Sequence, residues 1–297
     1  MPGLCLPHRA CGASDAYRLA LLAEDLGYES VWVSELATYD AYALACAIAV
    51  DTERITIGTA IVPVSTRTPA LHAMSMSTLA HLAAGRCIVG FGISTPPIIE
   101  GWHGQPGVVE RALTHTRRLF DFLDTALTGE KTHTGFRLEA PPEQPPQRYI
   151  GALGPRMRAF TRERADGLIL NFAPRSALAA EAAGEPGAVV LPIRIATGHD
   201  LHDAERRFRR ESASYLRVPA YANAIAEMGW PDVVPQGELQ AMADALPQEF
   251  VEDMAIFGEP HAKLAQMEDH GVSPLLVPIV APGDLEDFER VMRAAVT

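Results

Sequence analysis

Lysine is almost absent from this sequence, and long apolar runs are missing. Lys131 and Lys263 are the only lysines, so the positive charge comes almost entirely from arginine. The 37 acidic residues outnumber the 25 lysines and arginines and leave a net charge of −12. A nucleic-acid partner needs a basic face, so this balance argues against one, and also against an anionic membrane surface. The longest uncharged apolar run, AYALACAIAV, is about half the length that a membrane-spanning helix needs.

Motifs for metal binding and hydrolysis are missing as well. The four cysteines form no C-x-x-C pair, which argues against a zinc knuckle or a thioredoxin-type site. No G-x-S-x-G, H-E-x-x-H or Walker loop is present, so hydrolase and metalloprotease functions have no support. His199 and His202 have no strong third ligand nearby, and we assign them to a solvated helix N-terminus rather than to a metal. The first residues, MPGLCLPHRAC, lack the pattern of a signal peptide, and we expect a reduced, cytoplasmic protein.

Short apolar, β-rich runs alternate with helical patterns, as in a parallel sheet. Eight strands are predicted, at 3–7, 30–34, 55–62, 86–92, 148–153, 167–172, 188–197 and 273–280. This number predicts an α/β (β/α)8 TIM barrel, formed by a single domain over residues 1–297. An open doubly wound sheet is the alternative, disfavoured because no G-x-G-x-x-G turn follows the first strand. The longest inserts follow strands four and seven, with helical patterns over 106–128 and 200–254.

The active site of such a barrel lies at the C-terminal ends of its strands. Glu35 follows strand two, where burial would raise the pKa of a carboxyl toward values useful for acid/base chemistry, although a solvated loop acid is the alternative. Tyr39 fits a core residue, a stacking residue or a proton donor equally well. The other residues at the strand ends are rich in hydroxyls, glycines and arginines: His8, Arg9, Asp40, Ser65, Thr66, Arg67, Gly92, Ser94, Thr95, Gly154, Arg156, Asn171, Arg194 and Thr197.

Two helix starts on this rim predict sites for an anion. GALGPRMRAF places Pro155 at the first helical position, so backbone N–H groups of Arg156 and Met157 would point out of the helix. TRTPA repeats the arrangement, with Arg67 beside a helix that starts at Pro69. Each motif alone also fits ordinary helix initiation. Two of them on one rim favour a phosphate-bearing ligand.

The sequence resembles the bacterial luciferase-like superfamily of TIM barrels, and within it the coenzyme F420 (deazaflavin)-dependent oxidoreductases. The resemblance is carried, in order, by LAEDLGYESVWVSE, TERITIGTAIVPVSTRTPALHAMSMSTLAHLAAGR, IVGFGIS, YIGALGPRMRAFTRERADGLILNF and GEPHAKLAQMEDHGV. It implies hydride transfer between C5 of the deazaflavin and a small organic substrate, with the protein supplying orientation and a proton donor. A C=C or C=N bond of a secondary metabolite is the substrate expected from the altered proton donors described below. An FMN-dependent monooxygenase and a non-catalytic barrel with a decayed cofactor site are the alternatives.

The resemblance also implies which residues form the site. Strand three would carry a bulge with a non-prolyl cis peptide at Ala60–Ile61, followed by Val62, behind the deazaflavin ring. Arg67 would hold the cofactor's side chain or phosphate, and Glu35 and Tyr39 are the expected catalytic residues. The other expected cofactor contacts are Gly92, Ile93 and Ser94 at the ring or ribityl chain, and Ala152, Leu153, Gly154, Pro155, Arg156 and Met157 at the phosphate or oligoglutamate tail.

The sequence departs from the pattern of the resembled family at two proton donors. Leu36 follows Glu35 where the family often has histidine, and Ser94-Thr95-Pro96 stands where many relatives have a glutamate. These departures argue against a sugar-phosphate dehydrogenase and leave the substrate open. The resemblance further implies a homodimer paired through the helices after strands two and three, which AYALACAIAV and the apolar helix around Met74 support.

Overall fold

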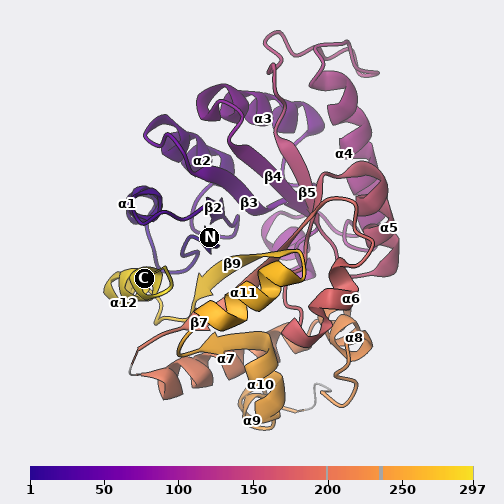
Figure 1. Cartoon of the computed structure of the whole chain (residues 1–297). Coiled ribbons are helices and arrows are strands. Elements are labelled where there is room, and N and C mark those ends of the chain that lie inside the picture. Colours follow the sequence, from indigo (N-terminus) through magenta and orange to yellow (C-terminus); the bar gives the residue numbers. More distant parts are fainter. Residues whose placement is uncertain (199, 234–236, 297) are drawn as a thin grey trace.

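A closed barrel of parallel strands, surrounded by helices, forms the centre of the computed structural model, which describes residues 1–198, 200–233 and 237–296 (Figure 1). The strands are β1 Gly3–Cys5, β2 Ser30–Val33, β3 Thr56–Pro63, β4 Cys87–Gly92, β5 Gln147–Gly151, β6 Gly167–Ile169, β7 Ala188–Ala196, β8 Ala255–Phe257 and β9 Val272–Pro278. The helices are α1 Ala13–Asp25, α2 Ala41–Val50, α3 Pro69–Ala83, α4 Ala112–Ala126, α5 Pro155–Arg164, α6 Leu178–Ala182, α7 Leu201–Leu216, α8 Pro219–Glu227, α9 Leu239–Asp244, α10 Gln248–Met254, α11 His261–Asp269 and α12 Leu285–Ala294, with a π-helical turn η1 Pro97–Trp102 and a 3₁₀ turn η2 Arg175–Ala177.

The strands are hydrogen-bonded in the order β6-β5-β4-β3-β2-β1-β9-β7, and pairing of β6 with β7 closes the ring. These are the eight predicted strands, so the TIM-barrel prediction is confirmed. Alternate residues point into the barrel, where the rings of Trp32 and Tyr149 lie 6.0 Å apart beside Ile169, Val190 and Leu275. Side chains therefore fill the interior of the barrel below the C-terminal ends of its strands, and these ends are where a site can form.

β8 is a ninth, short strand that the sequence patterns do not predict, because its three residues lie at the end of a long helical region. β7 pairs with β9 along one edge, from Val189 to Ile195. Its other edge is shared, because β6 pairs with it up to Val190 and β8 pairs with it from Arg194 onward. The insert after β7 therefore returns to the sheet and completes the wall of the barrel where β6 has ended.

The two inserts also contain less continuous helix than their patterns suggest. The helix predicted from residue 106 begins only at Ala112, because Gly107 has a left-handed backbone with φ of 72° that a helix cannot contain. Residues 97–102 form the π-helical turn η1 instead. Helices α7 to α10 divide the region from 201 to 254, and His199 lies outside the described residues. None of the described helices is both long and apolar enough to cross a membrane.

The predicted bulge lies at the C-terminal end of β3. The peptide bond between Ala60 and Ile61 is cis, as predicted, and the register between β3 and β4 shifts around it. Ser34, at the end of β2, donates a hydrogen bond from Oγ to the carbonyl oxygen of Ala60 at 2.8 Å. The backbone N–H of Glu35 donates to the carbonyl oxygen of Ile61 at 3.3 Å. The bulge is thus fixed to the loop after β2.

Candidate active site

The side chain of Ile61 lies between the ends of β4 and β5, where two glycines make room for it. A Cβ atom on Gly92 would lie 2.8 Å from Cγ1 of Ile61, and one on Gly151 would lie 3.5 Å from its Cγ2. Ile61 therefore requires a glycine at position 92. Ile93 is half-buried, and Ser94 has a left-handed backbone with φ of 65°. Ile61 and Gly92, two of the predicted ring contacts, thus lie together, whereas Val62 is fully buried in the main core.

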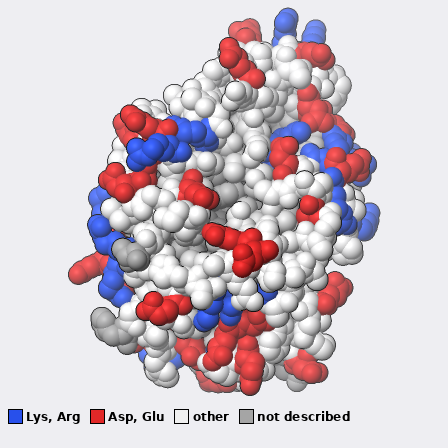
Figure 2. Space-filling view, viewed as in Figure 1, with Lys and Arg blue, Asp and Glu red and all other residues white. Residues whose placement is uncertain are grey.

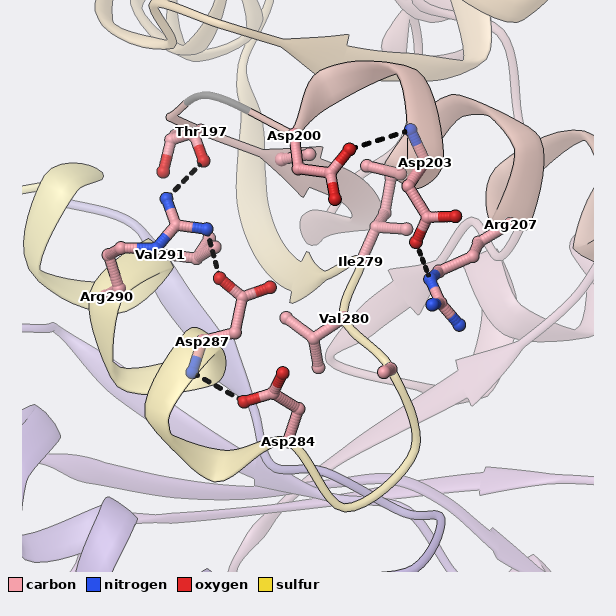
Figure 3. Close-up of a pocket in the computed structure, with 13 residues that line it drawn as sticks. Thr197, Asp200, Asp203, Arg207, Ile279, Val280, Asp284, Asp287, Arg290 and Val291 are labelled. Atoms are coloured by element: carbon pink, nitrogen blue, oxygen red, sulfur yellow. Dashed lines mark hydrogen bonds and ion pairs between the residues drawn. The ribbon is translucent and has the colours of Figure 1, made fainter.

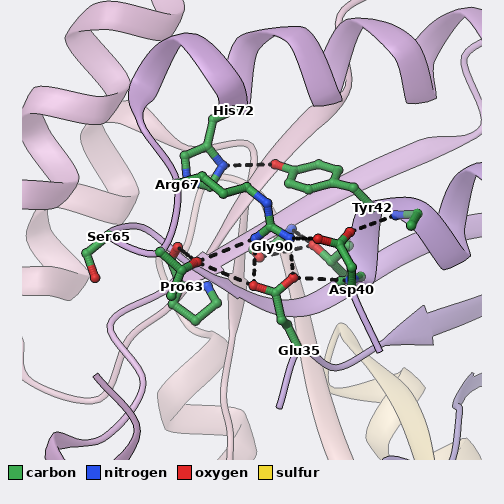
Figure 4. Close-up of polar contacts among 12 residues, drawn as sticks. Glu35, Asp40, Tyr42, Pro63, Ser65, Arg67, His72 and Gly90 are labelled. Atoms are coloured by element: carbon green, nitrogen blue, oxygen red, sulfur yellow. Dashed lines mark hydrogen bonds and ion pairs between the residues drawn. The ribbon is translucent and has the colours of Figure 1, made fainter. Parts of the chain in front are cut away.

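Glu35 and Arg67 form a two-pronged ion pair at the mouth of the barrel (Figure 4). Nη1 and Nη2 of Arg67 donate to Oε1 and Oε2 of Glu35, each at 2.6 Å, and the two side chains are only 10% and 11% exposed. Oε2 also accepts from the backbone N–H of Ala41 at 3.1 Å, and Arg67 pairs further with Asp40, which caps helix α2. Burial disfavours the charge of Arg67, but the hydrogen bonds and charges of Glu35 and Asp40 outweigh it and raise its pKa.

This ion pair uses two side chains for which the sequence predicts other roles: Glu35 as a catalytic residue, and Arg67 as a contact of the cofactor's side chain or phosphate. The Glu35 carboxylate is shared among Arg67, the N-terminus of α2 and Thr66, whose Oγ1 donates to it at 3.4 Å. Tyr39 donates its phenolic hydrogen bond to the carbonyl oxygen of Pro7, and burial raises the pKa of this phenol. The contacts favour a positioning role for all three side chains; proton donation by Glu35 or Tyr39 and phosphate binding by Arg67 stay predictions.

Helix α5 starts beside the mouth with an N-terminus that no side chain caps. Gly154 stands at the N-cap position, where a Cβ atom would meet nothing within 4 Å, and Pro155 occupies the first turn. Ala152 is buried, Leu153 and Met157 are half-buried, and Arg156 is exposed. The ten-residue helix therefore presents free backbone N–H groups and the positive end of its dipole to solvent.

A second polar cluster lies across the mouth, around Arg194 of β7. Its guanidinium donates to Oε1 of Glu211 at 3.1 and 2.9 Å, to the hydroxyl of Tyr215 at 3.0 Å and to Oδ1 of Asn171 at 3.2 Å. Asn171 in turn donates to the hydroxyl of Tyr221 at 2.9 Å. Asn171 and Arg194 were noted at the strand ends, but their partners come from α7 and α8, in the long insert. The available signal was an arginine inside the apolar strand AVVLPIRIAT.

His8, after β1, faces the same cluster. Its Nδ1 atom is buried and has no hydrogen-bond partner among the described residues. Burial lowers the pKa of His8 to about 4, with Glu211 opposing this change and Arg9 and Arg194 adding to it. The imidazole is therefore neutral at neutral pH, and an unpartnered ring nitrogen stands at the end of β1.

Seen from outside, the face in Figure 2 is hollowed near its middle, with mostly uncharged atoms lining the hollow and acidic side chains beside it. A separate cavity of about 140 Å³ lies between the N-termini of α7 and α12 (Figure 3). Asp200 and Asp284 cap these two helices, and Arg207 and Arg290 pair with Asp203 and Asp287. Thr197, noted at the end of strand seven, lines this cavity, but none of the expected catalytic or cofactor-contacting residues does, and both of its arginines are already paired, so we place the candidate site at the mouth.

His72, beside the ion pair, makes the stability of the protein depend on pH. Its side chain is fully buried, its Nδ1 lies 3.3 Å from the hydroxyl of Tyr42, and burial, aided by the charge of Arg67, lowers its pKa to about 4. In the unfolded chain the pKa is about 6.5. Between these values the unfolded state binds a proton that the folded state does not, so stability is lost as pH falls through this window.

We expect the free energy of unfolding to fall by about 3 kcal/mol on account of His72 when pH is lowered from neutral to about 4. Urea unfolding across this range measures the effect. His72→Gln, which keeps a polar partner for Tyr42, should flatten the dependence, although His8 contributes a fall of the same sign. An unchanged pH dependence in His72→Gln would show that His72 is already solvated in the folded state.

Comparison with known proteins shows which family this chain belongs to. The family model described as luciferase-like monooxygenase matches residues 5–273. The chain belongs to the luciferase-like monooxygenase family. A Mycobacterium tuberculosis protein, provisionally named as a coenzyme F420-dependent oxidoreductase, is 29% identical over 87% of this chain and 89% of its own length.

Solved structures confirm the fold. The coenzyme F420-dependent tetrahydromethanopterin reductase of Methanopyrus kandleri superposes with a TM-score of 0.75 at 20% identity, covering 99% of this chain and 97% of that one. The oxygenating constituent of the diketocamphane monooxygenase of Pseudomonas putida, solved with FMN, superposes with a TM-score of 0.71 at 14% identity, covering 100% and 96%. The protein is a luciferase-like oxidoreductase, and relatives of the same fold use two different cofactors.

Proposed function

We propose that this protein is a coenzyme F420-dependent oxidoreductase that transfers a hydride between C5 of the deazaflavin and a small organic substrate, such as a C=C or C=N bond of a secondary metabolite. The observation that carries the choice of F420 is the similarity over 87% of the chain to the M. tuberculosis protein of that name. The FMN-dependent monooxygenase is the second candidate, favoured by the fold shared with the FMN-bound P. putida enzyme.

The residues at the mouth fit a deazaflavin or a flavin. Ile61, with Gly92 beneath it, gives an uncharged surface against which a flat ring would pack, and Ile93 and Ser94 would follow along its side chain. The uncapped N-terminus of α5 would bind the phosphate, through backbone N–H groups rather than through a free cationic side chain. When bound, F420 supplies the hydride chemistry. The chain itself contributes the ring surface, the phosphate site and the polar groups across the mouth.

Titration of the purified protein with oxidised F420 and, separately, with FMN tests the choice of cofactor. Micromolar or tighter binding of F420, with none of FMN, is the expected result, whereas a preference for FMN would support the monooxygenase. Binding of neither would favour the third reading, a barrel without catalysis. That reading has one observation on its side, since Glu35 and Arg67 neutralise each other.

The phosphate site can be tested with two nearly isosteric side chains at Gly154. Both Gly154→Asn and Gly154→Asp should fold, since a Cβ atom there meets nothing within 4 Å and both residues are good N-caps. The aspartate places a negative charge where the phosphate would lie. We therefore expect Gly154→Asp to weaken F420 binding at least about tenfold relative to Gly154→Asn, with no loss of thermal stability. Equal affinities for the two variants would place the phosphate elsewhere.

We further propose a homodimer that buries the exposed apolar side chains of α3. Leu71, Met74 and Leu82 are 45%, 50% and 41% exposed on this helix, and Val50, at the end of the neighbouring α2, is 63% exposed. Light scattering should give twice the chain mass of 32.1 kDa, and Met74→Glu should shift the protein toward the monomer. Trp102→Glu, which removes an exposed apolar side chain from η1, is the matched control and should leave the dimer intact.

A further inference from the structure

The polar cluster around Arg194 faces the mouth of the barrel. Ile169 and Val190 point into the barrel, and side chains two residues apart on a strand point the same way. Asn171 and Arg194 therefore belong to the next inward layers above them, at the end where β6 and β7 stop. The charge of Arg194 opposes the rise in the pKa of Cys5, a residue of the barrel interior, and adds to the fall in the pKa of His8. The side chain of Arg194 is only 5% exposed.

The hydrogen bonds of this cluster fix the direction of each donor. Arginine can only donate, so the Asn171 atom that faces Arg194 at 3.2 Å must be the amide oxygen. The amide nitrogen then faces Tyr221 and donates to its hydroxyl oxygen at 2.9 Å. The phenolic oxygen is the acceptor in this bond, so the proton of Tyr221 points elsewhere. No acceptor for it exists within residues 1–198, 200–233 and 237–296.

Tyr221 is held firmly enough to present this proton in one direction. It lies near the start of α8, which begins at Pro219. Its ring stands edge-on against Tyr215 at 4.9 Å and 77°, and against Phe172 at 6.0 Å and 89°. Burial raises the pKa of Tyr221 to about 12, with the charge of Tyr215 adding to this and the Asn171 bond and Arg194 opposing it. The phenol is therefore protonated at neutral pH.

The mouth needs such a donor. The carboxylate of Glu35 is shared among Arg67, Ala41 and Thr66, and the phenol of Tyr39 is bound to a main-chain carbonyl. Leu36 has no proton to give. On the other side of the mouth, Tyr221 combines an uncommitted proton with a cationic network behind its oxygen.

We propose that Tyr221 is the catalytic residue that donates a proton to the substrate, and that Asn171 and Arg194 position it. The inference rests on the proposed function and names the substrate class: a C=N bond, or a C=C bond conjugated to a carbonyl, whose heteroatom accepts from the phenol. The substrate carbon receives a hydride from the reduced deazaflavin, which is thereby oxidised. The π electrons of the double bond move to the heteroatom, which takes the proton as the O–H bond of Tyr221 breaks. For the conjugated bond, this product is an enol that tautomerises in water.

The phenolate formed in this step lies 2.9 Å from the Asn171 amide nitrogen, with the Arg194 cation behind that amide. Both favour negative charge on the phenolic oxygen. Water at the half-exposed mouth returns the proton to Tyr221. Protons and electrons therefore balance with the reduced deazaflavin as the only reductant.

The test compares wild type, Tyr221→Phe and Tyr17→Phe in single-turnover oxidation of reduced F420 by cyclohexenone and by pyrroline, a C=C and a C=N probe. Tyr17 is the matched control, because its hydroxyl binds Asp51 at the surface, away from the mouth. Tyr221→Phe should slow the reaction at least about 100-fold, with F420 affinity and melting temperature unchanged. Wild-type rates in Tyr221→Phe would overturn the assignment and leave the proposed function standing. No binding of F420 to wild type would instead remove the proposed function and the inference with it.

A second readout does not depend on turnover. In protein labelled with fluorotyrosine and free of cofactor, the ¹⁹F resonance missing from Tyr221→Phe belongs to Tyr221. Cyclohexenone should shift this resonance, and Asn171→Ala should raise the pH at which it titrates, because the phenolate loses its donor. A resonance that responds to neither change would overturn the proposal even if the enzyme reduces neither probe.

Discussion

Replacing Arg67 by methionine is expected to lower the free energy of unfolding by about 3–5 kcal/mol, because it leaves the carboxylate of Glu35 buried without its partner. Both side chains are nearly inaccessible, at 10% and 11% exposure, and two 2.6 Å hydrogen bonds join them. Urea denaturation measures the loss. The same variant should weaken F420 binding, because the ion pair joins the loops after β2 and β3 beside the bulge at Ile61.

The double variant Glu35→Leu, Arg67→Met separates charge from packing. It removes both charges, and it should recover most of the stability that Arg67→Met alone loses. The exposed pair of Arg206 with Asp203 is the matched surface control, since Arg206 is 65% exposed and its replacement by methionine should cost under about 1 kcal/mol. A loss in Arg67→Met no greater than in this control would mean that Glu35 is hydrated, and would revive it as a free acid.

Gly90→Ala is expected to destabilise the protein by about 3 kcal/mol, the upper end of the range for overpacking, and to abolish cofactor binding. A Cβ atom at this position would lie 2.1 Å from the main-chain oxygen of Thr59 and 2.7 Å from Cδ1 of Ile169. Because the first obstacle is backbone, no side-chain rotation relieves it, and β3 must separate from β4. Thr59 also exchanges two hydrogen bonds with Gly90, at 2.9 and 3.1 Å, and these would be strained.

Gly101→Ala is the control for the change in chain entropy and composition. A Cβ atom there meets nothing within 4 Å, and the residue has no left-handed backbone. Thermal unfolding and F420 titration of the two variants should differ sharply. If Gly90→Ala has the same melting temperature and the same F420 affinity as Gly101→Ala, then β3 can move away from β4 without a loss of stability or binding, and the prediction is wrong.

The sequence predicted the barrel well because the strand pattern is local. The runs ITIGTAIV and AVVLPIRIAT lie within one or two residues of β3 and β7. The resemblance to a known family predicted the cis bond at Ala60–Ile61, which no propensity would indicate. The roles of single side chains were harder. Glu35 and Arg67 are 32 residues apart, and nothing in their local patterns shows that they meet.

Tyr221 shows the same difficulty in stronger form. It lies in the long helical region predicted over 200–254, and its significance depends on Asn171, 50 residues earlier, and on Arg194, which donates to Asn171. Its proposed role follows from the two hydrogen bonds of the Asn171 amide, one to Tyr221 and one from Arg194, because arginine can only donate. A linear pattern records the spacing of apolar residues, but it does not record which hydroxyl is left with an uncommitted proton.

Strand β8 also limits how this protein can be re-engineered. The region between β7 and α11 looks like a cassette that could be exchanged with a relative's to change specificity. β8, however, hydrogen-bonds to β7 with Arg194 opposite Ala255, so the cassette contributes part of the scaffold that orients Arg194. A graft whose helices do not hold these three strand residues against β7 would leave this part of the β7 edge open, and an open strand edge is a template for pairing between molecules. The cassette should therefore be exchanged together with β8, with the crossover point after Phe257, so that a change of specificity does not cost soluble expression.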